Sequence, residues 1–351
     1  MRSLVGMFDE LIQPISCYIP ETEEICGISR ITGIHLYLLV CLNVVLDLLM
    51  GCTSGGVRVK DADNTKMMHF RTLDWGMDPL RDLIVQLDFV GDSNPDKVIA
   101  SSITYVGFVG MLTGVRQDLS ASLNFRPVHD SSRNVAFYFN HVLHHPGSQT
   151  LTLDQIVANI PSIPTTVAYL IFSDGSSAVT MEKDHRRAVV RSSKSFIVVT
   201  NHDQQLTSTP TEIVVEENNA RWSCMQAKWD HKIRENVQAR FDAEKEIEFA
   251  QRDHPVPPQG TRSSLRLRQK QRQSQEEERD KTRAESQASL LASSKHLRLA
   301  ITKKEAIRWL KTYPTANEFT HYAALLDSAA GNIFWVERYD PALDETDLEN
   351  E

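Results

Sequence analysis

One apolar run near the N-terminus is the feature that most constrains how this chain can fold. The run, residues 36–50, reads LYLLVCLNVVLDLLM and contains two polar residues, Asn43 and Asp47. It stops at the small polar sequence GCTS, residues 51–54. Three interpretations fit an apolar run with this ending. It could be a membrane helix followed by a loop, a signal sequence with its cleavage site, or a buried helix that brings a cysteine to a point of chain cleavage.

The length and the polar residues of the run favour the buried helix. A membrane-spanning helix needs about 20 apolar residues, and an aspartate near the middle of the bilayer costs about 2.5–3.5 kcal/mol. Asn43 and Asp47 are four residues apart, so they share one helical face and can meet a polar partner there. A signal peptide is disfavoured because Asp9 and Glu10 interrupt the apolar stretch at the start of the chain. The sequence therefore predicts a core helix with one polar stripe and no transmembrane span.

The composition is typical of a globular protein. The chain has 351 residues, of which 41% are apolar and 24% charged, enough for a sizeable core. A formal net charge of −8 argues against a chain that coats nucleic acid or an anionic membrane. The five cysteines are odd in number and widely spaced, which excludes a disulfide framework and a CxxC zinc site. His141, His144 and His145 have no Cys, Asp or Glu at matching spacing, so no metal is predicted.

Most of the chain after the apolar run predicts antiparallel strands. Segments rich in Val, Ile, Phe and Tyr alternate with Gly or Asp-Asn turns, which is the pattern of short strands. These segments are GGVRV, MMHFRTLDW, DLIVQLDFV, KVIASSITYVGFVGMLTGV, SASLNFR, RAVVRSSKSFIVVTNHD and two hairpins at 166–184 and 321–339. Helical spacing is present at 134–145 and 152–160, and a short helical lead-in is expected over 1–35. A strand-rich middle flanked by helices predicts the α+β class.

A charged segment interrupts this pattern. Residues 228–296 are dominated by Arg, Lys, Glu, Gln and Ser, with a Pro-rich break at 255–258, and predict a disordered or partly helical insert. The basic part, 262–273, is followed at once by EEERD, so no nucleic-acid site is predicted. The final residues, 341–351, form an acidic tail.

The bond between Gly51 and Cys52 is a candidate cleavage site. A cysteine at the first position of a chain can act as a nucleophile with its own α-amine as the base, once the preceding bond is cut. A small residue such as Gly51 lets the backbone adopt the strained turn that self-cleavage needs. The alternative is a structural buried cysteine.

Two charged residues downstream could complete such a site. Arg71 and Asp74, in RTLDWG, could approach Cys52 from an adjacent strand. A guanidinium near a thiol favours the thiolate, and a carboxylate near an α-amine holds it in orientation. An R-x-x-D motif alone usually marks a surface ion pair. Together with GCTS and a later VVTNHD, it becomes a specific signal.

These motifs resemble the acid ceramidase and N-acylethanolamine acid amidase family, within the choloylglycine-hydrolase-like N-terminal nucleophile hydrolases. The resemblance covers residues 23–224, and 297–340 more loosely, and the charged insert has no counterpart. The stretches that carry it follow the order of the family: CTS at 52–54, RTLDWG at 71–76, YVGFVGMLTG at 105–114, SLN at 122–124, VVTNHD at 198–203 and Arg221 in NNARWSCM.

The resemblance implies a role for each matching residue at the cleavage site. Cys52 would be the nucleophile, and cleavage after Gly51 would unmask its α-amine. Arg71 would contact the nucleophile and the carbonyl of the substrate. Asp74 would bind the new α-amine.

The resemblance also implies an oxyanion site, with two departures from the family. Asn201 would donate to the oxyanion, a contact typically worth about 2.7–4 kcal/mol in the transition state. Arg221 would complete the polar network, although the family usually has two adjacent arginines there. An acidic residue usually follows the LN of the family, whereas Phe125 follows Asn124 in this chain. These two residues would form the edge of the substrate site.

A four-layer αββα sandwich is the fold that the resemblance implies. The chain would consist of an α piece, residues 1–51, and a β piece, 52–351, which remain associated after cleavage. The apolar run would be buried between them. The expected activity is hydrolysis of a fatty-acyl amide, either ceramide or an N-acylethanolamine, through a thioester and without a cofactor or metal. The lipid substrate would require at most transient contact with a membrane surface.

Several alternatives stay open from the sequence. The same thioester would serve an acyltransferase, and Phe125 and the long insert are also compatible with an uncleaved scaffold or binding protein. Trp75, Phe108, Met111 and Leu112 could line an acyl-chain pocket or pack in the core. The chain as given shows no signal peptide and no Asn-x-Ser/Thr acceptor, which indicates a cytoplasmic protein. The family usually works in the lysosome or a related acidic compartment, and a longer N-terminus would allow lysosomal, vacuolar or secreted placement.

Overall fold

Two compact units make up the protein. A computed structural model describes the chain over residues 20–46, 51–62, 64–91, 94–127, 151–165, 167–204, 212–252 and 299–340. One unit comprises residues 1–229 and 300–351, and the other comprises 230–299. The first unit contains both β-sheets and all of the predicted site residues. The predicted helix at 134–145, its three histidines and the acidic tail lie outside the described residues.

Five antiparallel strands from distant parts of the sequence form the first sheet. The order is β10-β1-β2-β11-β12, so the strand that begins at the predicted cleavage site lies between two neighbours. The bounds are β1 (Gly51–Asp61), β2 (Asn64–Asp74), β10 (Phe196–Val199), β11 (Thr320–Asp327) and β12 (Asn332–Arg338). Gly331, with φ of 72°, makes the predicted turn between β11 and β12.

Seven strands form the second sheet, and their order follows the chain from β3 to β9. Each joins its neighbour in an antiparallel pair, so the predicted strands and hairpins of this region are confirmed. The bounds are β3 (Ile84–Gly91), β4 (Asn94–Tyr105), β5 (Thr113–Arg116), β6 (Leu119–Phe125), β7 (Ala168–Ser173), β8 (Ala178–Lys183) and β9 (Ala188–Ser193). A 3-10 turn, η1 (Asp78–Leu83), connects the first sheet to the second.

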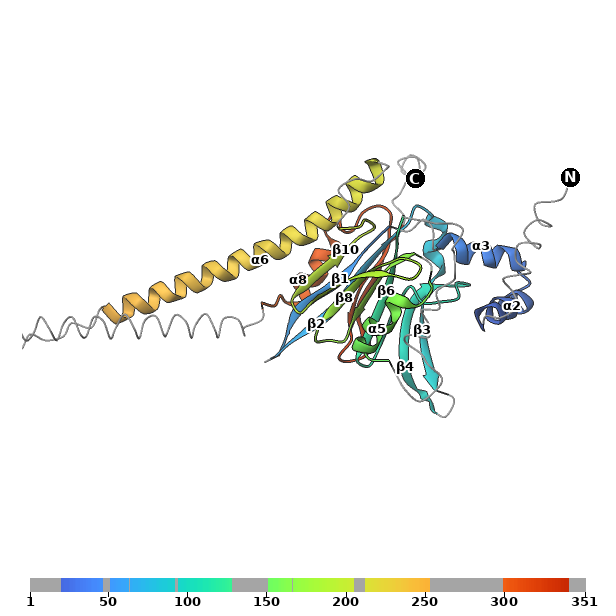
Figure 1. The fold of residues 1–351 in the computed structure, drawn as a ribbon, viewed down its shortest axis with the longest axis horizontal. Helices are drawn as coiled ribbons and strands as arrows, with labels where there is room; N and C mark the ends of the chain where they lie inside the picture. Colours follow the sequence, from blue (N-terminus) through green and yellow to red (C-terminus); the bar gives the residue numbers. More distant parts are fainter. Residues whose placement is uncertain are drawn as a thin grey trace, which may run out of the picture. The chain divides into compact units, whose positions relative to one another are not determined.

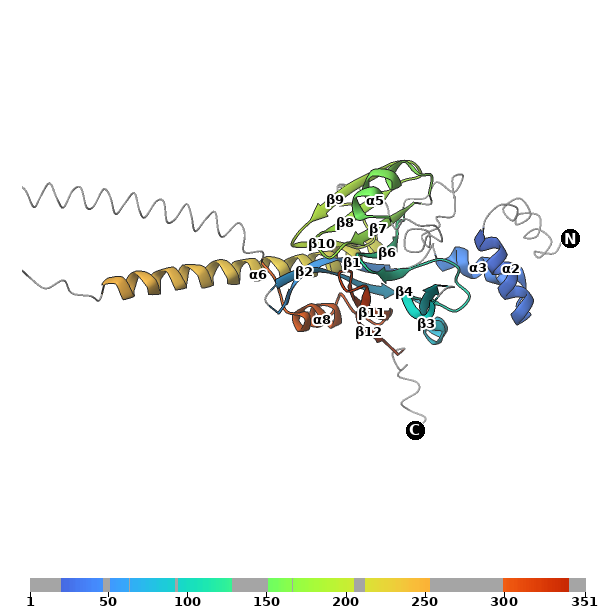
Figure 2. The same ribbon diagram turned by 90° about the horizontal axis from the view of Figure 1, so that it is seen from below.

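The two sheets pack face to face, and helices cover their outer faces (Figures 1 and 2). Helix α5 (Leu153–Asn159) and the 3-10 turn η3 (Ile160–Ser162) pack on the seven-stranded sheet through one apolar cluster. Helix α8 (Lys303–Lys311) packs on the five-stranded sheet. An aromatic cluster joins the first half of helix α6 (Glu212–Arg252) to the same face, with the ring centroids of Phe196 and Trp229 stacked 5.2 Å apart. The α+β layered sandwich predicted from the sequence is confirmed.

A polar layer runs between the two sheets. Side chains two residues apart in a strand share a face, so Ser120, Ser122 and Asn124 of β6 all point toward β2. There His69 Nδ1 lies 2.9 Å from Ser120 Oγ, and His69 Nε2 lies 2.8 Å from Ser122 Oγ. Arg71, the next inward residue of β2, contacts Asn124. This layer fixes the register of β6 under β2.

His69 should make the stability of the protein depend on pH. Burial, together with the charge of Arg71, lowers the pKa of His69 to about 3. The unfolded chain therefore binds a proton near pH 6.5 that the folded chain does not, so stability falls as pH drops below 6.5. Between pH 6.5 and 5, this residue should cost about 2 kcal/mol of unfolding free energy. His69→Gln can keep the two serine contacts without titrating, so urea unfolding of this variant should lose that part of the pH dependence.

The control for this prediction is His35→Gln, which removes an exposed imidazole and should leave the pH dependence of the wild type in place. If the unfolding free energy of the wild type and of His69→Gln depended equally on pH, the low pKa of His69 would not be the cause of that dependence.

Helices α2 (Pro20–Thr32) and α3 (Leu36–Leu46) confirm the helical lead-in and the start of the apolar helix. The burial expected for the apolar helix is found only in part. Among the side chains described over 36–43, Leu39 is buried, whereas Leu38 is 48% exposed. The reason is that α3 contacts the sheets along one side, near the turn after β4. No described helix is both long and apolar enough to cross a membrane.

The polar residue within α3 has the polar partner that the sequence predicted. Asn43 Nδ2 donates to the carbonyl of Gly107 at 2.9 Å, and Asn43 Oδ1 accepts from the backbone N–H of Val109 at 2.7 Å. Leu39 and Leu42 pack beside Gly107. This contact holds α3 to the turn between β4 and β5. Asp47 lies outside the described residues.

Helix α6 agrees with the alternative that the charged segment is partly helical. It continues without a break to Arg252, so the first part of the charged segment, 228–296, is ordered. This stretch is rich in Ala, Glu, Gln, Lys and Arg, which are strong helix formers. Lys232 and Glu235 form an ion pair of 3.2 Å one turn apart on the helix. Residues 253–298 lie outside the described ranges.

Candidate active site

Strand β1 places Cys52 against β2. The pairing register sets Gly51 opposite Asp74, Cys52 opposite Leu73, and Ser54 opposite Arg71. The prediction of a strained turn at Gly51 is wrong, because β-pairing with Asp74 already begins at this residue. The bond predicted to be cleaved lies in extended, paired backbone.

Arg71 binds the thiol of Cys52 from the space between the sheets. Its Nη2 donates to Cys52 Sγ at 3.3 Å, while Nη1 donates to the carbonyl of Leu123 at 2.7 Å and to Asn124 Oδ1 at 3.0 Å. Asn124 Oδ1 also accepts from Ser54 Oγ at 2.7 Å. The planar guanidinium is therefore fixed by three partners, and one of its N–H groups points at the sulfur.

Burial sets the protonation state of the thiol. Cys52 is completely buried, and this burial raises the pKa of its thiol above the usual value of about 9. The positive charge of Arg71 opposes the rise, and the negative charge of Asp74 adds to it. In the uncut chain the thiol is therefore protonated at neutral pH, and a base must remove its proton before it can attack.

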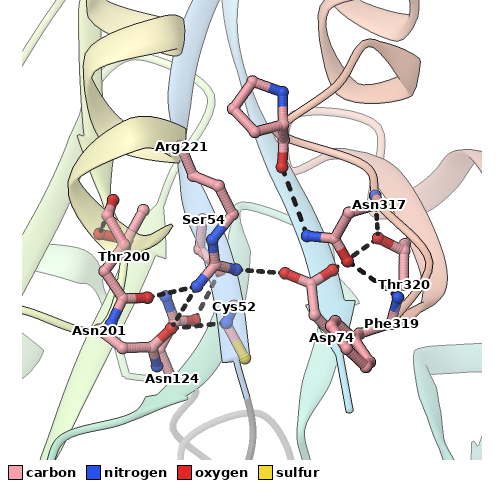
Figure 3. Close-up of polar contacts among 12 residues, drawn as sticks. Cys52, Ser54, Asp74, Asn124, Thr200, Asn201, Arg221, Asn317, Phe319 and Thr320 are labelled. Carbon is pink, nitrogen blue, oxygen red and sulfur yellow. Dashed lines mark hydrogen bonds and ion pairs between the residues drawn. The ribbon is translucent and has the colours of Figure 1, made fainter. Parts of the chain in front are cut away.

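The backbone nitrogen of Cys52 binds Asn201, the residue predicted to donate to the oxyanion. Cys52 N donates to Asn201 Oδ1 at 2.7 Å, and Arg221 Nη2 donates to the same oxygen at 3.2 Å (Figure 3). The amide nitrogen of Asn201 donates to the carbonyl of Phe125 at 2.6 Å. In the uncut chain, the donor predicted for the oxyanion is therefore engaged by backbone, and the oxygen of Asn201 marks the position of the nitrogen that cleavage would free.

Asp74 and Arg221 form a buried ion pair beside Gly51. Thr320 Oγ1 donates to Asp74 Oδ1 at 2.7 Å, and Arg221 also donates to Asn218 Oδ1. Burial raises the pKa of Asp74, and the attraction of Arg221 offsets part of the rise. A Cβ on Gly51 would lie 3.3 Å from Asp74 Cβ and 3.4 Å from Arg221 Nη2. A larger residue at position 51 would have to displace this pair slightly, which favours glycine there.

An apolar cluster surrounds the sulfur of Cys52. Its buried members include Leu73, Trp75, Tyr105 and Leu112, and the partly buried Leu42, Phe108 and Phe125 pack against it. The residues proposed for an acyl-chain pocket thus divide: Trp75, Phe108 and Leu112 lie in this cluster. Met111 belongs to the cluster under α5 on the opposite face of the sheet.

Three further side chains, which the sequence analysis did not identify, complete the site. Thr320 and Asn218 contact the ion pair, and Tyr322, fully buried on β11, lies in electrostatic contact with Arg71 and Cys52. Tyr322 Oη is 2.7 Å from Thr113 Oγ1. Asn218 precedes Arg221 by three residues on α6, so the two side chains lie on one face of this helix, which the sequence analysis did not predict over these residues. The two β11 residues depend on the pairing of β11 with β2, which is a long-range contact.

A metal site has no support in the part of the chain that the structure describes. Within those ranges no group of three or more His, Cys, Asp or Glu side chains could hold a metal ion.

Sequence comparison relates the chain to acid ceramidases over part of its length. It is 31% identical to mouse acid ceramidase over 140 residues, which are 36% of this chain and 32% of the relative. It is 30% identical to the human enzyme over 122 residues, 30% of this chain and 29% of the relative. An uncharacterized protein, R632, of Acanthamoeba polyphaga mimivirus is 27% identical over 133 residues, 37% of this chain and 39% of that protein. The chain thus matches about a third of the length of these relatives. No family model matches it.

Structural comparison defines the fold class. The Caenorhabditis elegans N-acylethanolamine-hydrolyzing acid amidase ortholog superposes with a TM-score of 0.50 at 18% identity, over 82% of this chain and 100% of that chain. The two antiparallel sheets and their covering helices are thus the fold of the N-terminal nucleophile hydrolases. Over the matched 140 residues, the chain is similar to the mouse and rat acid ceramidases at 31% and 29% identity.

Proposed function

We propose that this protein is an N-terminal nucleophile amidase with Cys52 as its nucleophile. The observation that carries the proposal is that both reacting groups of Cys52 are already bound. Its thiol accepts a hydrogen bond from Arg71 at 3.3 Å, and its backbone nitrogen donates to Asn201 at 2.7 Å. A buried structural cysteine would not need a guanidinium at its thiol, and its backbone nitrogen could find its acceptor in a neighbouring strand.

The first step of the proposed function cuts the chain before Cys52. The sulfur attacks the carbonyl carbon of Gly51, the C–N bond breaks, and the nitrogen takes up the thiol proton to give a free α-amine. Water then hydrolyses the resulting thioester, which releases the Gly51 carboxylate and regenerates the thiol. The proposed product is an α piece, 1–51, held by contacts such as those of Asn43 to a β piece, 52–351.

The same groups would then hydrolyse an external amide. The α-amine of Cys52 takes the thiol proton as the sulfur attacks the substrate carbonyl, and this proton goes to the leaving amine when the C–N bond breaks. Asn201 would turn its amide from Phe125 to the oxyanion, and Asp74 would hold the α-ammonium group. Water releases the acid from the thioester. Arg71 stabilises the charge that develops on the sulfur.

A fatty amide is the substrate class that the surroundings of Cys52 favour. The sulfur lies among apolar and aromatic side chains, and the partly buried Leu42, Phe108 and Phe125 give this cluster a boundary with solvent. A long acyl chain matches such a surface. The names of the relatives, acid ceramidase and N-acylethanolamine-hydrolyzing acid amidase, suggest ceramide or an N-acylethanolamine. Such a lipid would reach the site by transient contact with a membrane surface.

Mass measurement and N-terminal sequencing test the proposal directly. The freshly purified protein is held at about pH 4.5 and about pH 7, a range that spans the ordinary pKa of a histidine side chain, about 6.5. A new N-terminus that reads Cys-Thr-Ser, with release of acid from a fluorogenic fatty amide, is the expected result. Release of an N-acyl product when an amine acceptor is added would identify the acyltransferase form of the same chemistry.

One observation favours a second function, that of an uncleaved binding or scaffold protein. Cys52 is completely buried, and the amide of Asn201 is engaged by the carbonyl of Phe125. A chain that stays whole at both pH values and does not hydrolyse the fatty amide would support this second function.

A further inference from the structure

A buried ionic cluster lies next to the site but is not used by the proposed mechanism. Arg126 Nε donates to Asp203 Oδ1 at 2.7 Å, and its Nη2 donates to Asp203 Oδ2 at 2.5 Å. The phenol of Tyr169 donates to Asp203 Oδ1 at 2.8 Å. Arg126 and Asp203 are 7% and 9% exposed and Tyr169 is fully buried, so water does not compete for these contacts. Asp184, which is more exposed, also pairs with Arg126.

The cluster is placed to fix the turn that carries Asn201. Arg126 directly follows Phe125 at the end of β6, and Asp203 lies two residues after Asn201. The end of β6 and the turn after β10 are therefore joined twice. One connection is the hydrogen bond from Asn201 to the carbonyl of Phe125, and the other is the bidentate pair of Arg126 with Asp203.

The remaining contacts of this turn come from other elements. Thr200 Oγ1 donates to the carbonyl of Asn218 on α6 at 3.1 Å, and it lies 2.8 Å from His202 Nδ1. Gln204 N donates to Glu182 Oε1 at 3.1 Å. Arg221 also donates to Asn201 Oδ1. Asp203 differs from Asn201 in that its carboxylate forms a bidentate ion pair with an arginine, one of the strongest kinds of hydrogen-bonded pair in proteins.

We propose that Asp203, held by Arg126 and Tyr169, is a positioning residue that keeps Asn201 in place against the backbone nitrogen of Cys52. The expected effect of Asp203 on catalysis rests on the function proposed above. Its expected effect on the position of Asn201 is independent of that function.

The charge state of Asp203 agrees with this role. Burial acts to raise its pKa, but the hydrogen bonds from Arg126 and Tyr169 outweigh burial and lower it. Asp203 is therefore ionised over the whole range in which the protein would work, and Arg126 always has a charged partner. Asp203→Asn removes this charge with almost no change of shape, and leaves Arg126 with its exposed partner, Asp184.

Hydrogen exchange of the amide of residue 52 measures the position of Asn201 without any enzymatic activity. In the Cys52→Ala background the Gly51–Cys52 bond stays intact, and the amide of residue 52 keeps Asn201 Oδ1 as its acceptor. Adding Asp203→Asn should speed exchange of this amide by about tenfold or more, the effect of losing about one hydrogen bond. Tyr169→Phe, which removes one hydrogen bond to Asp203 but keeps the ion pair, should give a smaller change in the same direction.

The matched control is Asp327→Asn. Asp327 is an equally buried carboxylate, paired with Lys66 at 2.5 Å, at the end of β11 remote from the site. This variant should leave exchange at residue 52 within about twofold of its background, whatever it does to overall stability. Exchange that is equal in the Asp203→Asn and Asp327→Asn backgrounds would overturn the proposal.

A second measurement tests the catalytic consequence in the chain that retains Cys52. If the amidase activity is established, Asp203→Asn should lower kcat by about tenfold or more and change KM by less than about threefold, because Asn201 acts on the transition state. An unchanged kcat together with faster exchange would assign Asp203 to positioning in the uncut chain alone and overturn the catalytic part. An inactive wild type with faster exchange in Asp203→Asn would contradict the proposed function and support the positioning role.

Discussion

Replacing Cys52 by alanine should abolish both cleavage of the chain and hydrolysis of a fatty amide. The substitution removes the sulfur that receives the hydrogen bond of Arg71 and leaves the backbone of β1 unchanged. Loss of a nucleophile that acts with its base as a unit typically costs about 10⁴-fold or more in rate. Intact mass should show one uncut chain, and release of the fluorophore should fall to background.

Two further variants sharpen this test. Cys224→Ala removes a half-buried thiol of α6 and should leave cleavage and activity as in the wild type. Cys52→Ser keeps a weaker nucleophile at the same place and should cleave slowly or stop at the uncut chain. Full activity of Cys52→Ala would refute the role of this residue and the whole proposed mechanism.

Replacing Arg71 by lysine should have the next largest effect. Arg71 holds the carbonyl of Leu123, Asn124 and the thiol of Cys52 at the same time, with N–H groups in one plane. A lysine keeps the charge but cannot present this geometry, so the donor at the sulfur is lost. We expect kcat/KM to fall by about 100-fold or more, the size of one lost donor in the transition state. Chain cleavage should slow in parallel.

Arg58→Lys provides the matched control for this loss. Arg58 is also a buried arginine, on β1, and it binds the backbone carbonyls of Lys194 and Ser176 at 2.5 Å each, in the part of the strand away from Cys52. Its substitution should reduce thermal stability at least as much as Arg71→Lys does, with cleavage and kcat/KM close to the wild type. Similar losses of activity in both variants would show that Arg71 contributes through folding alone.

The sequence allowed the strands to be predicted because each short apolar segment is closed by its own turn residues. Hairpins such as β7–β8 are local, so Gly175 and its neighbours define them without knowledge of the rest of the fold. The proximity of Arg71 and Asp74 to Cys52 was also predictable as a juxtaposition of neighbouring strands. The side chains of Arg71 and Asp74 point in opposite directions because residues three apart in a strand lie on opposite faces of the sheet. Arg71 reaches the thiol, and Asp74 reaches Arg221.

Other parts of the site depend on contacts that no local pattern encodes. Thr320 and Tyr322 enter through the pairing of β11 with β2, more than 200 residues apart in the sequence. The turn expected at Gly51 is replaced by paired strand, because β2 supplies hydrogen-bonding partners up to Asp74. The partial exposure of α3 was not predictable from its composition. An apolar run shows how much surface could be buried, but it does not show which side of the helix is buried.

The attachment of α3 through Asn43 acquires a different meaning if the chain is cut. Before cleavage, α3 is covalently tied to β1, and its hydrogen bonds to Gly107 and Val109 form within one molecule. After cleavage the same contacts join two molecules, and the law of mass action governs them. The melting temperature of the cut protein should then rise with protein concentration, and dilution alone should release the α piece and uncover the surface around Gly107 next to the apolar cluster of Cys52.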